Sequence, residues 1–292
     1  MNSKISAVAS QISNQINKVL IGKETIIDYV LAAYFAGGHI LLEDMPGTGK
    51  TMLAKVLAKS VDGEFKRLQF TPDLLPSDVT GLNYYNQEKG KFEFRQGPVF
   101  SNILLADEIN RATPRTQSSL LEGMGEQQIT IDGTTRCLPN DFFVIATQNP
   151  IETLGTFSLP EAQVDRFMMK IPTGLPSFSQ ELEMMDRYMT EQPIEKVTPV
   201  CNLEDVHEIR EMVKNIYIQT EVRKYLLSIV TSTREDKNIL VGVSPRGTLD
   251  FMRASQALAA IREKNYVTPD DVKEIAPFVL GHRIVCSNNY NQ

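Results

Sequence analysis

Short apolar runs and longer amphipathic stretches alternate along the first 172 residues of the chain. The stretches 4–18 and 24–36 predict helices, and the second ends at Gly37-Gly38. Apolar runs predict strands, with helical stretches between them, near 39–43, 65–70, 102–106, 142–147 and 167–171. Strands that alternate with helices favour a mostly parallel sheet covered on both faces. The pattern therefore predicts an α/β domain over residues 1–172.

Two segments interrupt this rhythm with a period of two residues. Residues 81–95 alternate around Glu88-Lys89-Gly90, and residues 128–136 turn at Asp132-Gly133, which predicts two β-hairpins. The first carries four aromatic residues, of which two must face inward if the ribbon alternates: Tyr84, Tyr85, Phe92 and Phe94. Such hairpins either contact a partner or merely decorate the surface, and the sequence leaves both interpretations open.

The character of the chain changes after Pro172–Pro176, a stretch with Gly174 that is typical of a linker. Beyond it, every predicted element is a helix: 178–190, 203–214, 219–233, 246–263 and 269–282. The last two follow Ser244-Pro245 and Thr268-Pro269, which are helix start signals. We therefore expect a second, all-helical domain over residues 177–292, with a frayed polar end from Ser287.

Composition adds the expected size and environment of the protein. With 292 residues, 42% hydrophobic and 23% charged, the chain is long enough for two globular domains. A net charge of −6 argues against broad non-specific nucleic-acid binding. Three widely spaced cysteines predict neither a metal cluster nor a disulfide framework. The amino terminus lacks the apolar segment of a signal peptide, and the longest apolar region, 29–42, is too short to span a bilayer. A cytoplasmic protein without membrane insertion is therefore expected.

Residues 40–51 carry the clearest chemical pattern, because an apolar strand leads directly into Pro46-Gly47-Thr48-Gly49-Lys50-Thr51. Small residues let backbone N–H groups surround a phosphate, Lys50 can reach the β- and γ-phosphates, and the Thr51 hydroxyl can ligate Mg²⁺. The following helix, from Met52 to Ser60, adds its positive dipole end. Asp44 stands where the usual pattern has a glycine, so its carboxylate must point away from the nucleotide. A chance Gly-Lys-Thr in a turn is the alternative.

Two further strands end in polar residues at the same predicted sheet edge. Asp107 and Glu108 follow the strand near 102–106, where Asp107 would hold Mg²⁺ and Glu108 would polarise the attacking water. A solvated acidic pair with Asp107 as a helix cap is the alternative. Asn149 follows the strand near 142–147, and its amide can orient that water, although Asn before Pro is also ordinary turn chemistry.

Together these residues resemble the MoxR group of AAA+ ATPases. The matching segments are 41–51, Ala-Asp-Glu-Ile-Asn-Arg-Ala from 106, Thr-Gln-Asn-Pro-Ile-Glu from 147, Leu-Pro-Glu-Ala-Gln-Val-Asp-Arg-Phe from 159 and Ser-Pro-Arg from 244. The resemblance implies an AAA+ P-loop αβα sandwich with a parallel five-stranded sheet and a C-terminal all-helical lid. Gly123 and Gly125 depart from the family pattern, and two helical glycines cost roughly 1 kcal/mol each, so we expect that helix to end early or to be mobile.

The resemblance also implies roles for individual residues. Asn149 would be sensor 1, Arg166 an arginine finger that reaches the ATP of a neighbouring subunit, and Arg246 sensor 2, acting within its own subunit. Arg111 and Arg115 are the alternatives for the finger. The turn from Val19 to Gly22, with Ile21, would lie against the adenine, although a core contact between helices explains it equally well. Arg246 opens a helix, where a cation is unfavourable unless a phosphate compensates; an exposed helix-end arginine is the alternative.

The resemblance finally implies ATP and Mg²⁺ as ligands, ATP hydrolysis, and a homohexameric ring. The activity would be chaperone-like, as remodelling of a client protein or insertion of a cofactor, with a von Willebrand factor A domain protein as partner. Two other functions stay open: a nucleic-acid remodeller, which needs clustered Lys and Arg, and a nucleotide-gated binding module, which needs a damaged site. The first hairpin mixes Lys and Glu, and Glu108 and Arg166 are both present, so both alternatives are disfavoured.

Overall fold

A computed structural model describes residues 2–43, 47–149, 155–190 and 192–287. Its main sheet has five parallel strands in the order β2-β5-β8-β1-β9. The strands are β1 (Ile40–Glu43), β2 (Phe65–Gln69), β5 (Ile103–Asp107), β8 (Phe143–Gln148) and β9 (Met169–Pro172). The predicted parallel sheet is thus confirmed, and its carboxyl-terminal edge collects the ends of β5 and β8.

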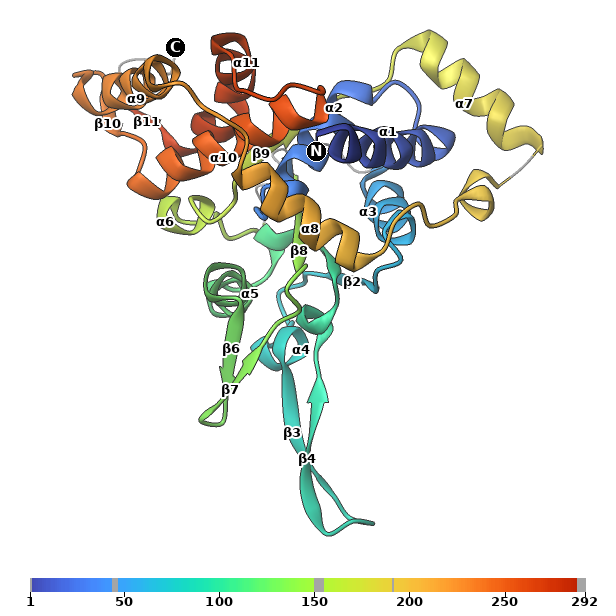
Figure 1. The fold of residues 1–292 in the computed structure, drawn as a ribbon. Helices are drawn as coiled ribbons and strands as arrows, with labels where there is room; N and C mark the ends of the chain where they lie inside the picture. The colour runs from blue at the N-terminus through green and yellow to red at the C-terminus, as the bar shows by residue number, and fades with distance from the viewer. Residues whose placement is uncertain (1, 44–46, 150–154, 191, 288–292) are drawn as a thin grey trace.

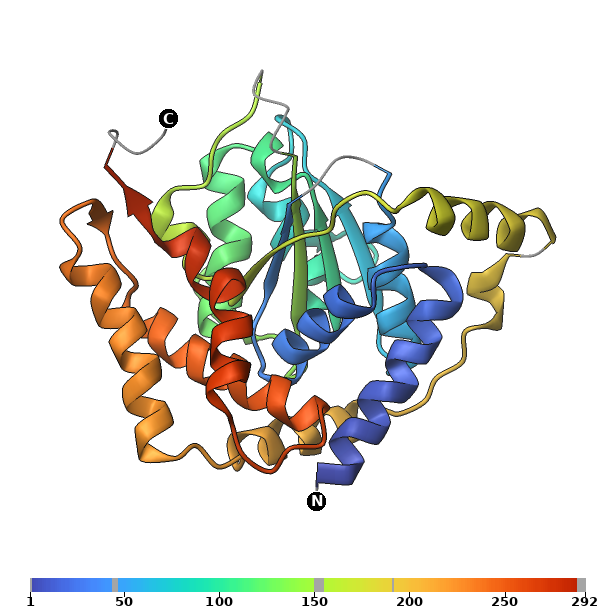
Figure 2. The ribbon, with the colours of Figure 1, turned by 90° about the horizontal axis from the view of Figure 1, so that it is seen from above.

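Helices cover both faces of the sheet because its buried strands send alternate side chains to opposite sides (Figure 2). In β1, Ile40 and Leu42 join one hydrophobic cluster, whereas Leu41 joins the other. The first cluster contains α1 (Asn2–Val19), α2 (Glu24–Phe35) and α3 (Lys50–Ser60). The second contains α4 (Pro76–Thr80) and α5 (Pro114–Glu126). Helices thus pack on both faces of the sheet, and the candidate site lies at the carboxyl-terminal edge of its strands.

Both predicted hairpins are present, as β3 (Gly81–Asn86) with β4 (Lys91–Gln96) and β6 (Gln128–Ile131) with β7 (Thr134–Cys137). They project from the same side of the molecule (Figure 1), and the Asn83 amide donates to an Asp132 carboxylate oxygen at 2.8 Å between them.

The aromatic residues of the first hairpin correct one expectation. Tyr84, Tyr85 and Phe92 are 41%, 54% and 72% exposed, and only Phe94 is partly covered, by the Phe100 ring and the Arg136 guanidinium. The prediction that two of the four face inward is therefore wrong, because the ribbon stands away from the body and both its faces meet solvent (Figure 1).

Helix α5 also differs from its prediction, since it runs unbroken through both glycines to Glu126. A Cβ on Gly123 would lie 3.1 Å from Leu138 Cδ1 and 3.3 Å from Ile129 Cγ2, at the base of the second hairpin. A Cβ on Gly125 would lie 3.3 Å from Arg166 Nη1. The expected early end is therefore wrong: close packing of the hairpin and of Arg166 against α5 compensates for the low helix propensity of glycine.

The C-terminal region is helical, as predicted. Its helices are α7 (Phe178–Thr190), α8 (Leu203–Lys214), α9 (Thr220–Glu235), α10 (Pro245–Ile261) and α11 (Pro269–Leu280). Ser244 Oγ accepts from Gly247 N at 3.1 Å, and Thr268 Oγ1 from Asp271 N at 3.4 Å, so both start signals act as caps.

The region is not all-helical, because β10 (Ile239–Val241) pairs antiparallel with β11 (Val285–Cys286). Strands this short leave no periodic signal in the sequence. In the part of the chain that the structure describes, the remaining short elements are α6 (Glu161–Val164) and the 3₁₀ helices η1 (Pro98–Phe100), η2 (Ile109–Arg111), η3 (Pro193–Lys196) and η4 (Gly281–Arg283). The frayed end predicted for residues 287–292 lies, apart from Ser287, outside the described residues.

Helices α8 and α10 pack on α1 and α2, α9 and α11 pack on α10, and residues of all four share one hydrophobic cluster with α1 and α2. Only α7 extends away from this block, on the side of α1 (Figures 1 and 2). The domain division between 172 and 177 stays a prediction. Across the described residues, no helix combines the length and apolar character that a membrane crossing requires, and all three cysteines are free.

Candidate nucleotide-binding site

The loop after β1 has a backbone that only glycine adopts easily. Gly47 and Gly49 have φ angles of 88° and 90°, in the left-handed region. A Cβ on Gly49 would also lie 2.6 Å from Leu20 Cδ2, so the loop packs directly on the turn between α1 and α2. Helix α3 then begins at Lys50, and its first turn carries no acidic side chain. The first N–H groups of a helix have no acceptor within the helix, so a helix start of this kind can bind an anion. Pro46, predicted to be part of this loop, lies outside the described residues, as does Asp44.

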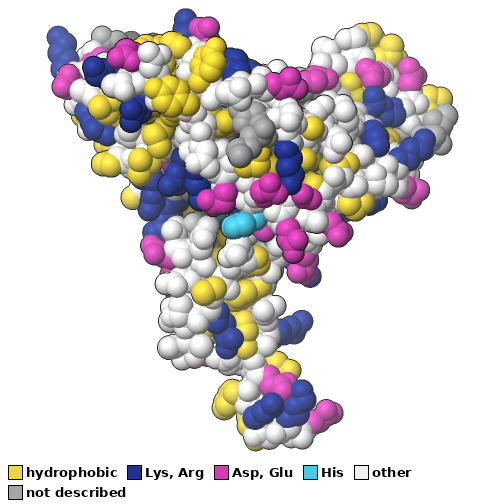
Figure 3. Space-filling view, viewed as in Figure 1, with side chains coloured by type: hydrophobic (Ala, Val, Ile, Leu, Met, Phe, Trp, Pro, Cys, Tyr) yellow, Lys and Arg dark blue, Asp and Glu magenta, His cyan; other side chains and the backbone are white. Residues whose placement is uncertain are grey.

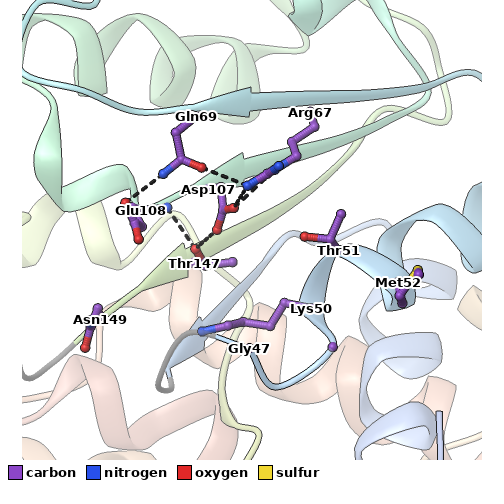
Figure 4. A pocket seen from close by; sticks show the side chains of 11 residues that line it. Gly47, Lys50, Thr51, Met52, Arg67, Gln69, Asp107, Glu108, Thr147 and Asn149 are labelled. Atoms are coloured by element: carbon purple, nitrogen blue, oxygen red, sulfur yellow. Dashed lines mark hydrogen bonds and ion pairs between the residues drawn. The ribbon is translucent and has the colours of Figure 1, made fainter.

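The loop opens into a cavity of about 360 Å³ at the carboxyl edge of the sheet (Figure 4). Five residues predicted from separate segments line it together: Lys50, Thr51, Asp107, Glu108 and Asn149. The other lining residues are Gly47, Gly49, Met52, Arg67, Gln69 and Thr147. The strand order explains this convergence, because β1 and β5 both pair with β8.

The acidic pair at the end of β5 is held by a hydroxyl from β8. Thr147 Oγ1 donates to Asp107 Oδ1 at 2.7 Å and accepts from Glu108 N at 2.8 Å. Glu108 has a φ of 55°, an uncommon left-handed conformation for a residue other than glycine. The chain therefore turns sharply between the two carboxylates, which gives them different partners.

Those partners come mainly from β2. Arg67 Nη2 lies 2.7 Å from Asp107 Oδ2, and Gln69 Nε2 donates to Glu108 Oε2 at 2.7 Å (Figure 4). Arg111 Nη1 also donates to Glu108 Oε2, at 2.9 Å, so this alternative for the arginine finger contacts its own chain's carboxylate.

Sequence reasoning missed Arg67, Gln69 and Thr147. A signal for the first two was their spacing of two residues, which puts both on one face of a strand. Thr147 was visible only as the polar residue that closes an apolar run.

A second cavity, of about 310 Å³, adjoins the first and shares Gly47, Gly49 and Met52 with it. Its other walls come from the turn 19–21, Lys23, Thr48, residues 175–176 and α7. On α7 the lining side chains include Met184 and Tyr188, which sequence reasoning did not select. The Tyr188 hydroxyl donates to Val19 O at 3.4 Å, and Arg187 Nη1 donates to Lys18 O at 2.8 Å, so α7 is anchored on the end of α1.

The chemistry of the second cavity differs from that of the first. Apolar side chains such as Ile21, Met52 and Met184 dominate its wall, whereas most of the side chains that line the first are charged or polar. A polar end beside an apolar end suits a molecule that joins phosphates to a planar base. The predicted nucleotide contacts Ile21, Gly47, Thr48, Gly49, Lys50, Thr51 and Met52 all line one or both cavities.

Arg166 and Arg246 are absent from the walls of both cavities and line a separate one of about 500 Å³. Its wall also includes His39, Gly125 and Arg253. Arg166 donates to the carbonyl of Leu121 on α5. The expectation that Arg246 acts on its own chain's nucleotide is not supported, because α10 packs on α1, α2 and α8, and its first turn lies beside the end of α5 instead. Arg115, the remaining alternative for the finger, is exposed on α5.

A phosphate loop between a parallel strand and a helix, with an acidic pair on a nearby strand and a helical region beside the sheet, defines a P-loop ATPase. Residues 39–169 match the model of the ATPase family associated with various cellular activities (AAA), and residues 231–292 match the AAA lid domain. The chain belongs to the MoxR family of AAA ATPases, and ATP binding follows from that membership.

The relatives cover most of the chain. YeaC of Bacillus subtilis, whose function is not characterised, is 50% identical over 92% of this chain and 84% of its own length. Chaperone MoxR1 of Mycobacterium tuberculosis is 39% identical over 93% of this chain and 74% of its own. A crystal structure of a candidate ATPase from Cytophaga hutchinsonii superposes with a TM-score of 0.90 and 42% identity, covering 98% of this chain and 91% of that one.

Proposed function

We propose that this protein hydrolyses ATP in a ring, at sites that two neighbouring subunits complete together. One observation carries the proposal: the phosphate loop lines one cavity of the chain, whereas Arg166 and Arg246 line another. Arginines that line another cavity than their own phosphate loop are placed to act on the site of another subunit. A heterologous, head-to-tail interface that closes gives a ring. Six subunits, as in the resembling family, stay a prediction.

The residues present fit Mg²⁺-ATP. The Thr51 hydroxyl and the Asp107 carboxylate line one cavity, and both are the oxygen ligands that Mg²⁺ prefers. A bound Mg²⁺ would neutralise charge on the phosphates. Asp107 pairs with Arg67 in this structure, so metal binding would compete with that ion pair.

The chain's own groups supply the remaining chemistry. Lys50 and the N–H groups of the loop bind phosphates in the ground state. The Glu108 carboxylate, held by Gln69 and Arg111, polarises a water, and the Asn149 amide orients it. Ile21 and Met52 contact the base.

Single variants test the assignment of binding and turnover. Lys50→Ala should lose ATP binding, whereas Glu108→Gln should keep it and stop hydrolysis, because Glu108 acts on the water and not on the nucleotide. Isothermal titration with ATP and a phosphate-release assay measure the two properties separately. Equal ATP affinity in wild type and Lys50→Ala would contradict the site.

Mixed rings test whether the arginines act between subunits. An arginine finger contributes about 10³ to 10⁵ in rate with little effect on binding, so Arg166→Ala should bind ATP and be nearly inactive. When mixed with Lys50→Ala subunits, it should regain about a quarter of the wild-type rate, since a quarter of random interfaces pair an intact pocket with an intact arginine. Arg246→Ala should behave in the same way. No recovery in rings shown to contain both subunits would mean that these arginines act within their own chain.

We further propose a chaperone-like action on a protein client. The exposed Tyr84, Tyr85 and Phe92 on the projecting hairpin support this role, because exposed aromatic side chains are enriched at protein interfaces. Likeness to a relative named as a chaperone agrees with it. A partner with a von Willebrand factor A domain stays a prediction.

The nucleic-acid alternative receives no support from the hairpin tip. Lys89 and Lys91 lie 2.9 Å and 3.7 Å from Glu93 Oε1, and acidic and basic side chains mix on this end of the molecule (Figure 3). A ribbon that binds phosphate backbones needs uncompensated positive charge.

Capture of binding partners from native lysate on the Glu108→Gln variant, with Lys50→Ala as control, tests the client proposal. A client should be retained by the ATP-trapped variant alone; capture of nucleic acid instead would contradict the proposal.

A further inference from the structure

A buried arginine joins the segment that carries Arg166 to the helix that carries Arg246. The Arg283 side chain is 1% exposed, and its Nε lies 2.8 Å from Asp165 Oδ1. Its Nη2 lies 2.6 Å from Asp250 Oδ2, on α10. Nη2 also donates to the carbonyls of Asp165 and Phe167 at 3.0 Å each. Arg283 is thus bonded to both residues that flank Arg166 in the sequence.

The start of α10 is tied into the same network. Ser244 Oγ, which caps α10, donates to Asp165 and lies 3.0 Å from each carboxylate oxygen. A Cβ on Gly247 would lie 2.9 Å from Arg283 Cδ, so the missing side chain lets Arg283 approach the first turn of α10. Arg246 lies between these two contacts in the sequence.

We propose that Arg283 is a positioning residue, which holds Arg166 and Arg246 in one fixed arrangement so that both enter the neighbouring subunit's ATP site together. The inference rests on the proposed function, since it assumes that both arginines act between subunits. A buried charge shared by two carboxylates and several carbonyls resists local rearrangement, because any opened bond leaves a desolvated charge unpaired. The network couples the two arginines through their backbone segments, because the hydrogen bonds named above are made by neighbouring residues and not by the guanidinium groups of Arg166 and Arg246.

A purely structural role is the alternative, and Arg210, a second buried arginine, provides a control for it. Arg210 is also buried, and donates to Tyr34 O at 3.1 Å and Asn140 O at 3.0 Å, with Asp141 Oδ1 at 3.6 Å. It has fewer contacts with carboxylates and carbonyls than Arg283, and it lies on α8, outside the residues that line the arginine cavity. A general loss of stability should affect Arg283→Met and Arg210→Met alike.

The test measures ATP affinity, turnover and recovery in mixed rings for both variants. Arg283→Met should bind ATP as wild type does and lose about 10²-fold in turnover, the typical effect of displacing a catalytic group by an ångström. Mixed with Lys50→Ala, it should regain activity, since its lesion then lies on the arginine side of the interface. Arg210→Met should keep its turnover at temperatures where it stays folded. Loss of ATP binding in Arg283→Met, or no recovery where Arg166→Ala recovers, would overturn the proposal.

Hydrogen exchange separates this inference from the proposed ring. Arg283→Met should raise amide exchange in residues 161–167 and 244–250 together, and Arg210→Met should raise it in neither. If Arg166→Ala itself fails to complement Lys50→Ala, the proposed ATP site between subunits is wrong, and so is the proposal that Arg283 positions both arginines for a neighbouring subunit. If complementation succeeds but exchange rises in one segment alone, Arg283 does not couple the two arginines. Asp250→Asn, which keeps the shape of the side chain, replaces Arg283→Met if that variant does not fold, with the same expected outcomes.

Discussion

Acid should destabilise this protein through His39, which is buried between α5 and the sheet. Its Nδ1 accepts from Val144 N at 3.1 Å, and its Nε2 lies 3.3 Å from Met124 O. A ring that accepts at one nitrogen and donates at the other is neutral. The pKa of His39 is lowered from 6.5 to about 4: burial is the main cause, the hydrogen bond to Met124 opposes it, and the charge of Arg210 adds to the lowering.

The direction of the effect follows from proton binding. The unfolded chain takes up a proton on His39 near pH 6.5, whereas the fold resists it until about pH 4. The stabilisation from neutral His39 is therefore fully present above pH 6.5 and is lost as the pH falls from there toward 4. Between pH 7 and pH 5 the loss amounts to about 2 kcal/mol. Burial also lowers the pKa of His282, to about 3, and this residue adds a loss of the same sign.

Urea unfolding at the two pH values, followed by circular dichroism, measures this loss. The free energy of unfolding should fall by about 2 kcal/mol less in His39→Gln than in wild type over this interval, whatever the variant costs at pH 7. His207→Gln, which replaces an exposed imidazole on α8, is the control and should follow wild type. An equal fall in wild type and His39→Gln would refute a neutral, buried His39.

Three further predictions concern the site and the hairpin. Gly125→Ala should stabilise α5 by up to about 1 kcal/mol in thermal unfolding, because alanine has the higher helix propensity. It should also reduce turnover, because the added Cβ would lie 3.3 Å from Arg166 Nη1; unchanged turnover would argue against Arg166 as a finger held at this position. Thr147→Val removes both hydroxyl bonds to the acidic pair and should lower the rate more than ATP affinity; a loss of affinity alone would contradict this. Phe92→Ser, at an exposed tip position, should weaken client capture and leave basal ATP turnover and Tm unchanged. A lowered Tm would mean that the phenyl group of Phe92 stabilises the fold instead.

The sequence predicted the elements of the fold well, because they depend on local patterns. Apolar runs locate all five parallel strands. Ser244 and Thr268 cap the helices that they were expected to begin. The phosphate loop and the acidic pair were predicted for the same reason: their chemistry requires particular residues in a short, ordered stretch.

What the sequence did not reveal depends on contacts between distant segments. Arg67 and Gln69 become site residues only because β2 pairs with β5 and not with another strand. The glycines of α5 look destabilising until the side chains that pack against them are known. The location of Arg246 depends on which helices α10 packs against, and no local pattern encodes that.

The single hydrophobic cluster that joins α1 and α2 to α10 and α11 limits how a subunit can move. Close-packed interiors are nearly incompressible, so the C-terminal helices cannot swing open as a flap without breaking the core. Such packing favours a stiff body around the sheet. In the proposed ring, the work of ATP hydrolysis would therefore appear as rotation of whole subunits about their shared sites, with the projecting hairpins as levers that enlarge small angular changes.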